Sequence, residues 1–76
     1  MRGLKMGATF AVRGDHIRLD QLLKAVGWVG SGGEAHAAVE GGHVRVDGAV
    51  ETRKRAKLRA GQKVELAGEA VELVAE

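Results

Sequence analysis

The chain has 76 residues, no cysteine and a formal net charge of only +2, from 12 lysines and arginines against 10 acids. This length holds one small core, so we expect residues 1–76 to form a single domain with a flexible tail at 1–7, and the lack of cysteine excludes disulfides and thiolate zinc sites. No run of about eighteen apolar residues and no apolar signal-peptide core is found, so we expect a cytoplasmic protein that does not span a membrane.

The first half of the chain predicts one strand and two helices. Thr9–Val12 is a short extended segment that ends before Gly14, and we expect it at the edge of a sheet. The spacing of the leucines and valine over 19–26 predicts an amphipathic helix, which Gly27 ends. In its first turn an aspartate stands four residues before Lys24, a spacing at which opposite charges pair.

A second helix is predicted to begin at Ser31. With Glu34 this serine fits a capping box, in which the hydroxyl accepts the third backbone N–H and the carboxylate accepts the serine's own. Its buried side would consist of small residues, Ala35, Ala38 and Val39, which allow close packing on the first helix. Two glycines at 41–42 end it.

The second half of the chain predicts strands, because the apolar period changes to two. The segments 44–46 and 49–51 flank Asp47-Gly48, a strong signal for a tight hairpin. Val64–Ala67 and Ala70–Val74 flank Gly68-Glu69, which we interpret as a second two-residue turn. The order predicts an α+β fold, with two packed helices against a small twisted antiparallel sheet of about five short strands.

The strongest chemical signal is the basic run Arg53–Arg59. It reads R-K-R-A-K-L-R, with five cations and no acid, so the other 69 residues carry seven cations against ten acids. An isolated basic run is as often a solvated loop as a contact surface, but this polarised charge attracts polyanions to one side of the molecule. We therefore expect this run to be a loop between the two hairpins, whose cations form one continuous positive surface beside the paired helices.

Other motifs carry weaker signals. Gly30–Ala35 spells the G-x-G-x-x-A of a dinucleotide-binding turn, but it follows a helix instead of a strand, so no cofactor is expected. A phosphate could still approach the N–H groups of Gly32 and Gly33, although Glu34 occupies the same positive helix end. No paired acid and base, metal-ligand set or nucleophile motif is present, so we do not expect an enzyme.

The histidines and aromatic residues are interpreted structurally. His16, His36 and His43 lack metal-site spacing, so we expect polar side chains that face solvent, with His36 also a candidate phosphate contact. Trp28 lies between the helices and is expected to seal the core instead of stacking on a base. Because only one other aromatic residue exists, recognition of nucleic-acid backbone and shape is favoured over base stacking.

Four segments together resemble the S-four RNA-binding domain family, which takes its name from ribosomal protein S-four. They read R-L-D-Q-L-L at 18–23, S-G-G-E-A at 31–35, G-H-V-R-V-D-G at 42–48 and K-L-R-A-G at 57–61. From Phe10 onward the chain is also similar to small stand-alone bacterial proteins of the YbcJ type, which share F-x-x-x-G-x-x-I-x-L-D-Q-L-L-K and S-G-G-E-A and carry no catalytic domain.

The resemblance implies a pair of helices called the αL motif, packed on a small sheet, with structured RNA of the rRNA or tRNA kind lying along it. The ribosome is then one candidate partner, and no cofactor is implied. The positions that match RNA-facing residues of the family are Arg18, Lys24, Ser31, Gly32, His36, Arg45, Arg53, Lys54, Arg55 and Lys57. Gly32 and Asp47 stand where many members have arginine and asparagine, and both differences reduce phosphate attraction near the helices.

One alternative function stays open, that of an adaptor that docks on an acidic protein through the basic run or an exposed hairpin edge. A complex that survives ribonuclease would favour it. Nothing in the sequence requires a dimer, so we expect a monomer.

Overall fold

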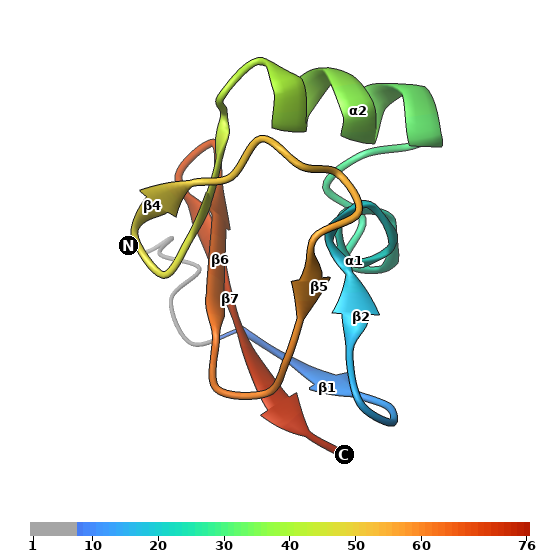
Figure 1. The fold of residues 1–76 in the computed structure, drawn as a ribbon, viewed down its shortest axis with the longest axis vertical. Helices are drawn as coiled ribbons and strands as arrows, with labels where there is room; N and C mark the ends of the chain where they lie inside the picture. Colours follow the sequence, from blue (N-terminus) through green and yellow to red (C-terminus); the bar gives the residue numbers. More distant parts are fainter. Residues whose placement is uncertain (1–7) are drawn as a thin grey trace.

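The computed structural model describes residues 8–76, so the tail expected at 1–7 lies outside the described part (Figure 1). In Figure 1 the two helices lie along the top and right of the view, and the longer strands run down the left. The elements, in chain order, are β1 Thr9–Val12, β2 Ile17–Arg18, α1 Leu19–Ala25, α2 Gly32–Glu40, β3 Val44–Val46, β4 Ala49–Val50, β5 Lys57–Leu58, β6 Lys63–Leu66 and β7 Glu69–Ala75. The predicted α+β class is confirmed, with two packed helices against a five-stranded sheet.

The main sheet has the strand order β1-β7-β6-β3-β4. Strands β3, β4, β6 and β7 pair antiparallel as expected, whereas the edge strand β1 runs parallel to β7, with Thr9 opposite Glu72 and Val12 opposite Ala75. Tight hairpins force antiparallel pairing, but β1 and β7 are separated by both helices and all the other strands, so no turn fixes their relative direction. The sheet is therefore mixed.

Both hairpin turns have positive φ at their two central residues, and the second turn lies one residue earlier than predicted. The predicted Asp47-Gly48 turn is present, with φ of 53° and 86°. The second turn is Ala67-Gly68, with φ of 53° and 83°, instead of Gly68-Glu69. A type I′ turn needs positive φ at both central residues, and glycine adopts positive φ most readily. In both turns the glycine, Gly48 or Gly68, is the second central residue. Glu69 therefore begins β7, opposite Leu66.

A second, two-stranded sheet divides the basic run, which we had expected to be a loop throughout. Strand β5 pairs antiparallel with β2, with Leu58 opposite Ile17 and Lys57 opposite Arg18. Ala56 and Leu58 are buried, while the residues on either side of each are exposed. From Arg55 to Arg59 the run therefore has a period of two, with cations pointing outward and apolar side chains inward, as in a half-buried strand.

The core fills the space between the helices and one face of the main sheet. Its largest fully buried side chains are Leu19, Leu22, Leu23, Leu58, Leu73, Val39, Val44 and Val64. Burial of one leucine contributes roughly 1.5–3 kcal/mol, so these residues dominate the stability of the domain. Trp28, in the connection between the helices, is partly buried and packs against this core, in agreement with the predicted role in covering it. Within 8–76 neither helix is long or apolar enough to cross a lipid bilayer.

The cap of α2 differs in one bond from the predicted capping box. The Ser31 hydroxyl accepts the Glu34 N–H at 3.2 Å, as expected. The Glu34 carboxylate, however, accepts the N–H of Gly30 at 2.7 Å instead of that of Ser31. The carboxylate still occupies the positive end of the helix, where it opposes the approach of a phosphate.

Candidate nucleic-acid interface

The basic segment, residues 53–59, is held against the start of α1 by main-chain hydrogen bonds. The N–H of Leu19 donates to the carbonyl of Ala56, and the N–H of Asp20 donates to the carbonyl of Lys54, both at 2.9 Å. The first N–H groups of a helix have no partner inside the helix, so these two carbonyls satisfy donors that would otherwise need a side-chain cap. The predicted position of the segment beside the helices is therefore present in the structure.

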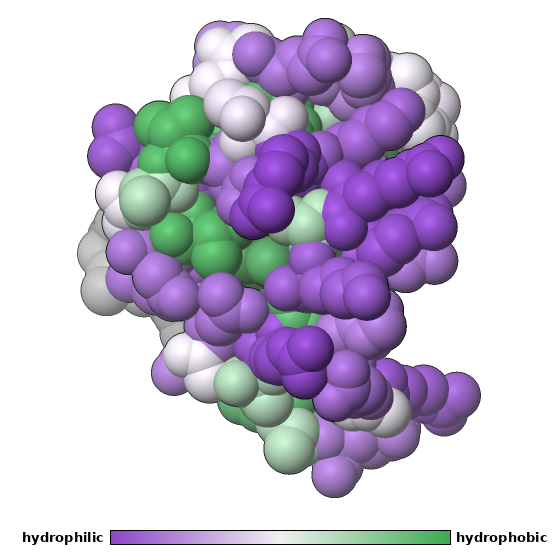
Figure 2. Space-filling model, in the orientation of Figure 1, coloured by the Kyte–Doolittle hydropathy of each residue, from purple (hydrophilic) through white to green (hydrophobic). Residues whose placement is uncertain are grey.

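The cations of this segment cover one face of the molecule. Figure 2 shows strongly hydrophilic side chains gathered over the connection from β4 to β5 and along β5, with a hydrophobic area beside them over β4. An open hollow of about 430 Å³ is lined by Arg53, Arg55, Ala56 and Lys57. Across the part of the chain that the structure describes, Lys54, Arg55 and Lys57 form no ion pair with an acid. Their charge is available to a ligand.

The expectation of one uninterrupted positive surface is only partly met, because carboxylates outside the run reach two of its arginines. Arg53 pairs with Glu51 at 3.0 Å, and Arg59 pairs with Asp15 at 2.9 Å. The unpaired cations therefore lie between two paired ones.

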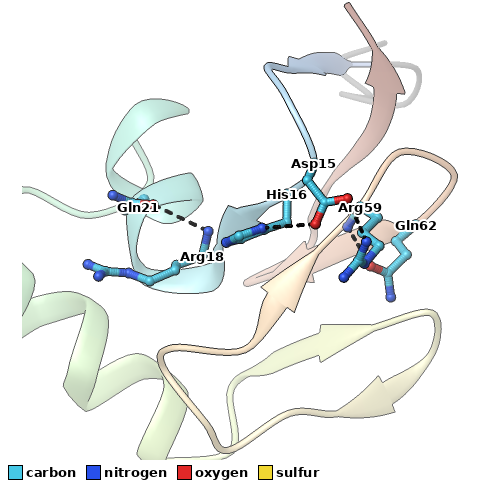
Figure 3. A network of polar contacts seen from close by, with 6 residues as sticks. All are labelled: Asp15, His16, Arg18, Gln21, Arg59 and Gln62. Carbon is cyan, nitrogen blue, oxygen red and sulfur yellow. Dashed lines mark hydrogen bonds and ion pairs between the residues drawn. The ribbon is translucent and has the colours of Figure 1, made fainter.

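Asp15 is the centre of a polar network at the C-terminal end of the segment (Figure 3). Its carboxylate accepts from Arg59 and lies 3.4 Å from the His16 ring, while the Gln62 side chain accepts the Arg59 N–H at 2.8 Å. These contacts join the turn after β1 to the end of β5. Arg59 is therefore engaged in a structural contact.

Arg18 and Lys24 lie on the α1 side of the interface. Arg18 precedes the helix directly and pairs with Asp20, with Nε and Oδ1 3.2 Å apart. The predicted pairing of Asp20 with Lys24 is not found, because this carboxylate is occupied by Arg18. Lys24 is exposed in the last turn of α1 and has no ion pair within residues 8–76.

Three other candidates belong to α2, and the structure gives each of them a different environment. The Ser31 hydroxyl is used by the helix cap, and Gly32 is exposed in the first turn, while the Glu34 carboxylate lies against Gly30. His36 was expected to face solvent, but its ring is only half exposed. Its Nε2 lies 3.0 Å from Glu40, and its enclosed Nδ1 has no hydrogen-bond partner among the described residues. The start of α2 is thus less open to phosphate than the basic segment.

Arg45 lies apart from the other candidates. It follows buried Val44 on β3 and stands opposite Glu65 of β6, so strand alternation places its side chain on the face of the sheet that points away from the core. Its guanidinium donates to the Gly48 carbonyl at 3.4 Å. The structure therefore does not bring Arg45 together with the basic segment.

Glu51 gives the interface a pH dependence. Hydrogen bonds from the Arg53 side chain and then from its main-chain N–H lower the pKa of Glu51 below the ordinary 4.5. A lowered folded-state pKa stabilises the protein above the unfolded value, and this contribution disappears as the pH falls through the folded value. We expect Glu51→Gln to have a lower Tm than the parent at neutral pH, with the gap closing below pH 4.5. Thermal melts across this range measure it, and a gap independent of pH would contradict the assignment.

Comparison with known proteins places the chain in a family. The model of the S4 domain matches residues 10–74. The chain belongs to the S4 domain family. It is 52% identical over 69 residues to the “Putative RNA-binding protein YbcJ” of Escherichia coli (strain K12), which covers 90% of this chain and 99% of that protein. The “Uncharacterized protein YbcJ” of Shigella flexneri matches with the same identity and coverage.

A solved structure agrees with this assignment. The solution structure of YbcJ from E. coli, described as revealing an αL motif involved in RNA binding, superposes with a TM-score of 0.73. It is 47% identical in sequence, and the match covers 99% of this chain and 96% of that one. The resemblance to the S-four family and to the YbcJ type that the sequence motifs indicated is thereby confirmed.

Proposed function

We propose that this S4 domain is a non-catalytic RNA-binding protein, which contacts the phosphate backbone of structured RNA through its basic segment and the start of α1. The observation that carries the proposal is the main-chain anchoring of the segment beside α1, with Lys54, Arg55 and Lys57 unpaired within residues 8–76. Long cationic side chains held close together are suited to neighbouring phosphates of a nucleic-acid chain. The names of its relatives support the same chemistry.

The position of the aromatic side chains favours recognition of backbone over bases. Phe10 and Trp28 both pack against the core, and both line a crevice beside Val26, just past the C-terminal end of α1. The basic segment lies at the opposite end of that helix. No aromatic platform among residues 8–76 therefore stands beside the cations to stack unpaired bases. Phosphate contacts position a protein on RNA without reading its sequence, which suits recognition by shape.

The predicted RNA-facing residues form a central and a peripheral group. The central group comprises Lys54, Arg55 and Lys57, with Arg53 and Arg18 beside them. Lys24 lies at the other end of α1 and is separate from this group. The peripheral group comprises Ser31, His36 and Arg45, whose polar groups are used by the fold or point elsewhere, and Gly32, which has no side chain to offer a phosphate. This arrangement fits a monomer that acts in the cytoplasm and binds rRNA or a tRNA-like fold. The bound RNA is either free or part of the ribosome.

The salt dependence of binding tests the proposal. If about five cations each neutralise one phosphate of a single-stranded segment, the logarithm of the association constant falls against the logarithm of salt concentration with a slope of about −3.5. Filter binding of an RNA hairpin with a single-stranded loop, measured at several salt concentrations, gives this slope. Binding that does not weaken with salt would exclude a phosphate-contacting surface.

A further inference from the structure

Two arginines at this interface are held by carboxylates in the same manner. Arg53 donates from Nε and Nη2 to the two oxygens of Glu51, at 3.0 and 3.2 Å. Arg18 donates from Nε and Nη2 to the two oxygens of Asp20, at 3.2 and 3.4 Å. The acids are mostly enclosed, with 18% and 15% of their side chains exposed, whereas the arginines are 78% and 41% exposed. In both pairs the acid lies inward and the arginine outward.

This side-on geometry leaves the outer edge of each guanidinium open. A guanidinium carries five N–H groups, and pairing through Nε and Nη2 uses one on each nitrogen. In the described part of the structure, Nη1 of Arg18 and Nη1 of Arg53 have no hydrogen-bond partner. The edge formed by Nη1 and Nη2 matches two oxygens of a phosphate, so each arginine can bind its acid and a phosphate at the same time.

The two carboxylates are themselves fixed by the main chain. Glu51 accepts the N–H of Arg53 at 2.9 Å, and Asp20 accepts the N–H of Gln21 at 2.9 Å. The two pairs also lie at one junction, since the N–H of Asp20 donates to the carbonyl of Lys54, the residue after Arg53. Each acid is thus a fixed support against which a long, flexible side chain is oriented.

We propose that Glu51 and Asp20 are positioning residues, which hold Arg53 and Arg18 so that each guanidinium presents its free edge to an RNA phosphate. The inference rests on the proposed function and adds the device that orients its arginines. Pre-organisation increases affinity because the side chain loses less freedom on binding. The opposite interpretation is that the acids merely neutralise the arginines and repel RNA.

Glu51→Gln separates the two interpretations by the sign of its effect. If Glu51 acts mainly by repelling RNA, its removal should tighten RNA binding. If it acts mainly by holding the Arg53 guanidinium at two points, its removal should weaken RNA binding by about fivefold. Glutamine is nearly isosteric with glutamate and keeps a side-chain oxygen that can accept the main-chain N–H of Arg53, so this local hydrogen bond is retained. Glu72→Gln, on the exposed side of β7, removes the same charge away from the interface and should not weaken binding.

A double-mutant cycle shows whether Glu51 acts through Arg53. Filter binding is measured for Glu51→Gln, Arg53→Ala and the double variant, and we expect the glutamine to have no further effect once Arg53 is gone. Arg53→Lys, which keeps the charge but not the planar fork, should lose about as much affinity as Glu51→Gln. The salt slope of Glu51→Gln should equal that of the parent, because the number of cations is unchanged.

The outcomes are distinguishable from failure of the proposed function. If the parent binds RNA and Glu51→Gln binds equally well or better, the positioning role is overturned while RNA binding stands. An equal loss in the presence and absence of Arg53 would also overturn it, since Glu51 would then act by another route. If the parent protein does not bind RNA, the proposed function fails and the positioning role fails with it.

Discussion

Exchange of Arg53, Lys54, Arg55 and Lys57 for glutamate is expected to abolish RNA retention, with a loss of about a thousandfold or more in affinity. The four changes remove the central phosphate contacts and place four acids on the same face, so attraction becomes repulsion. These side chains are mostly exposed, and the main-chain carbonyls that anchor the segment to α1 are retained. Filter binding measures the loss, and circular dichroism checks that the variant folds. Retention equal to that of the parent would contradict the interface.

A matched pair of double variants separates local contact from net charge. One carries Arg55→Glu and Lys57→Glu, in the hollow of the basic segment. The other carries Arg13→Glu and Lys63→Glu, two exposed cations outside the interface with the same total change in charge. We expect a loss of about a hundredfold for the first and less than about threefold for the second at moderate salt. Equal losses would mean that overall charge alone governs binding.

Leu58→Ala is expected to destabilise the domain by about 3 kcal/mol, within the usual range for a buried leucine. Leu58 is 2% exposed and stands opposite Ile17 in the small sheet, where it holds the basic segment to the core. The loss is large for a domain of this size, which buries comparatively little surface on folding. Urea denaturation followed by circular dichroism measures it.

Val50→Ala is the control for this effect, because it removes apolar atoms from the one large hydrophobic side chain of residues 8–76 that is exposed. We expect less than about 0.5 kcal/mol of destabilisation there. Similar effects at the two positions would show that β5 is not anchored in the core as described.

The elements predicted correctly are those whose pattern is local. The leucine spacing of α1 and the Asp47-Gly48 turn are each written within a few neighbouring residues, and both are present. Strands β2 and β5 have two residues each, too few for a period to be recognised, and β5 lies among cations. The parallel direction of β1 depends on packing between the two ends of the described chain, which no local pattern encodes.

The same distinction applies to the interface. The basic run was predicted from its composition, but the pairing of Arg59 with Asp15 joins residues 44 positions apart and depends on tertiary structure. The pairing of Glu51 with Arg53, in contrast, could have been predicted from the sequence. Residues two apart in an extended segment point to the same side, so an acid two positions before the run could have been expected to reach its first arginine.

The anchoring of the basic segment through Lys54 and Ala56 carbonyls separates the shape of the interface from its chemistry. Every amino acid has a backbone carbonyl, so the exposed side chains along this strip can be exchanged during evolution without removing the bonds that fasten it to α1. In such a domain the position of the strip is set by the backbone, while its surface chemistry is set by side chains that can vary. Homologous chains could thereby change their RNA target by altering a few surface cations while the scaffold keeps its geometry.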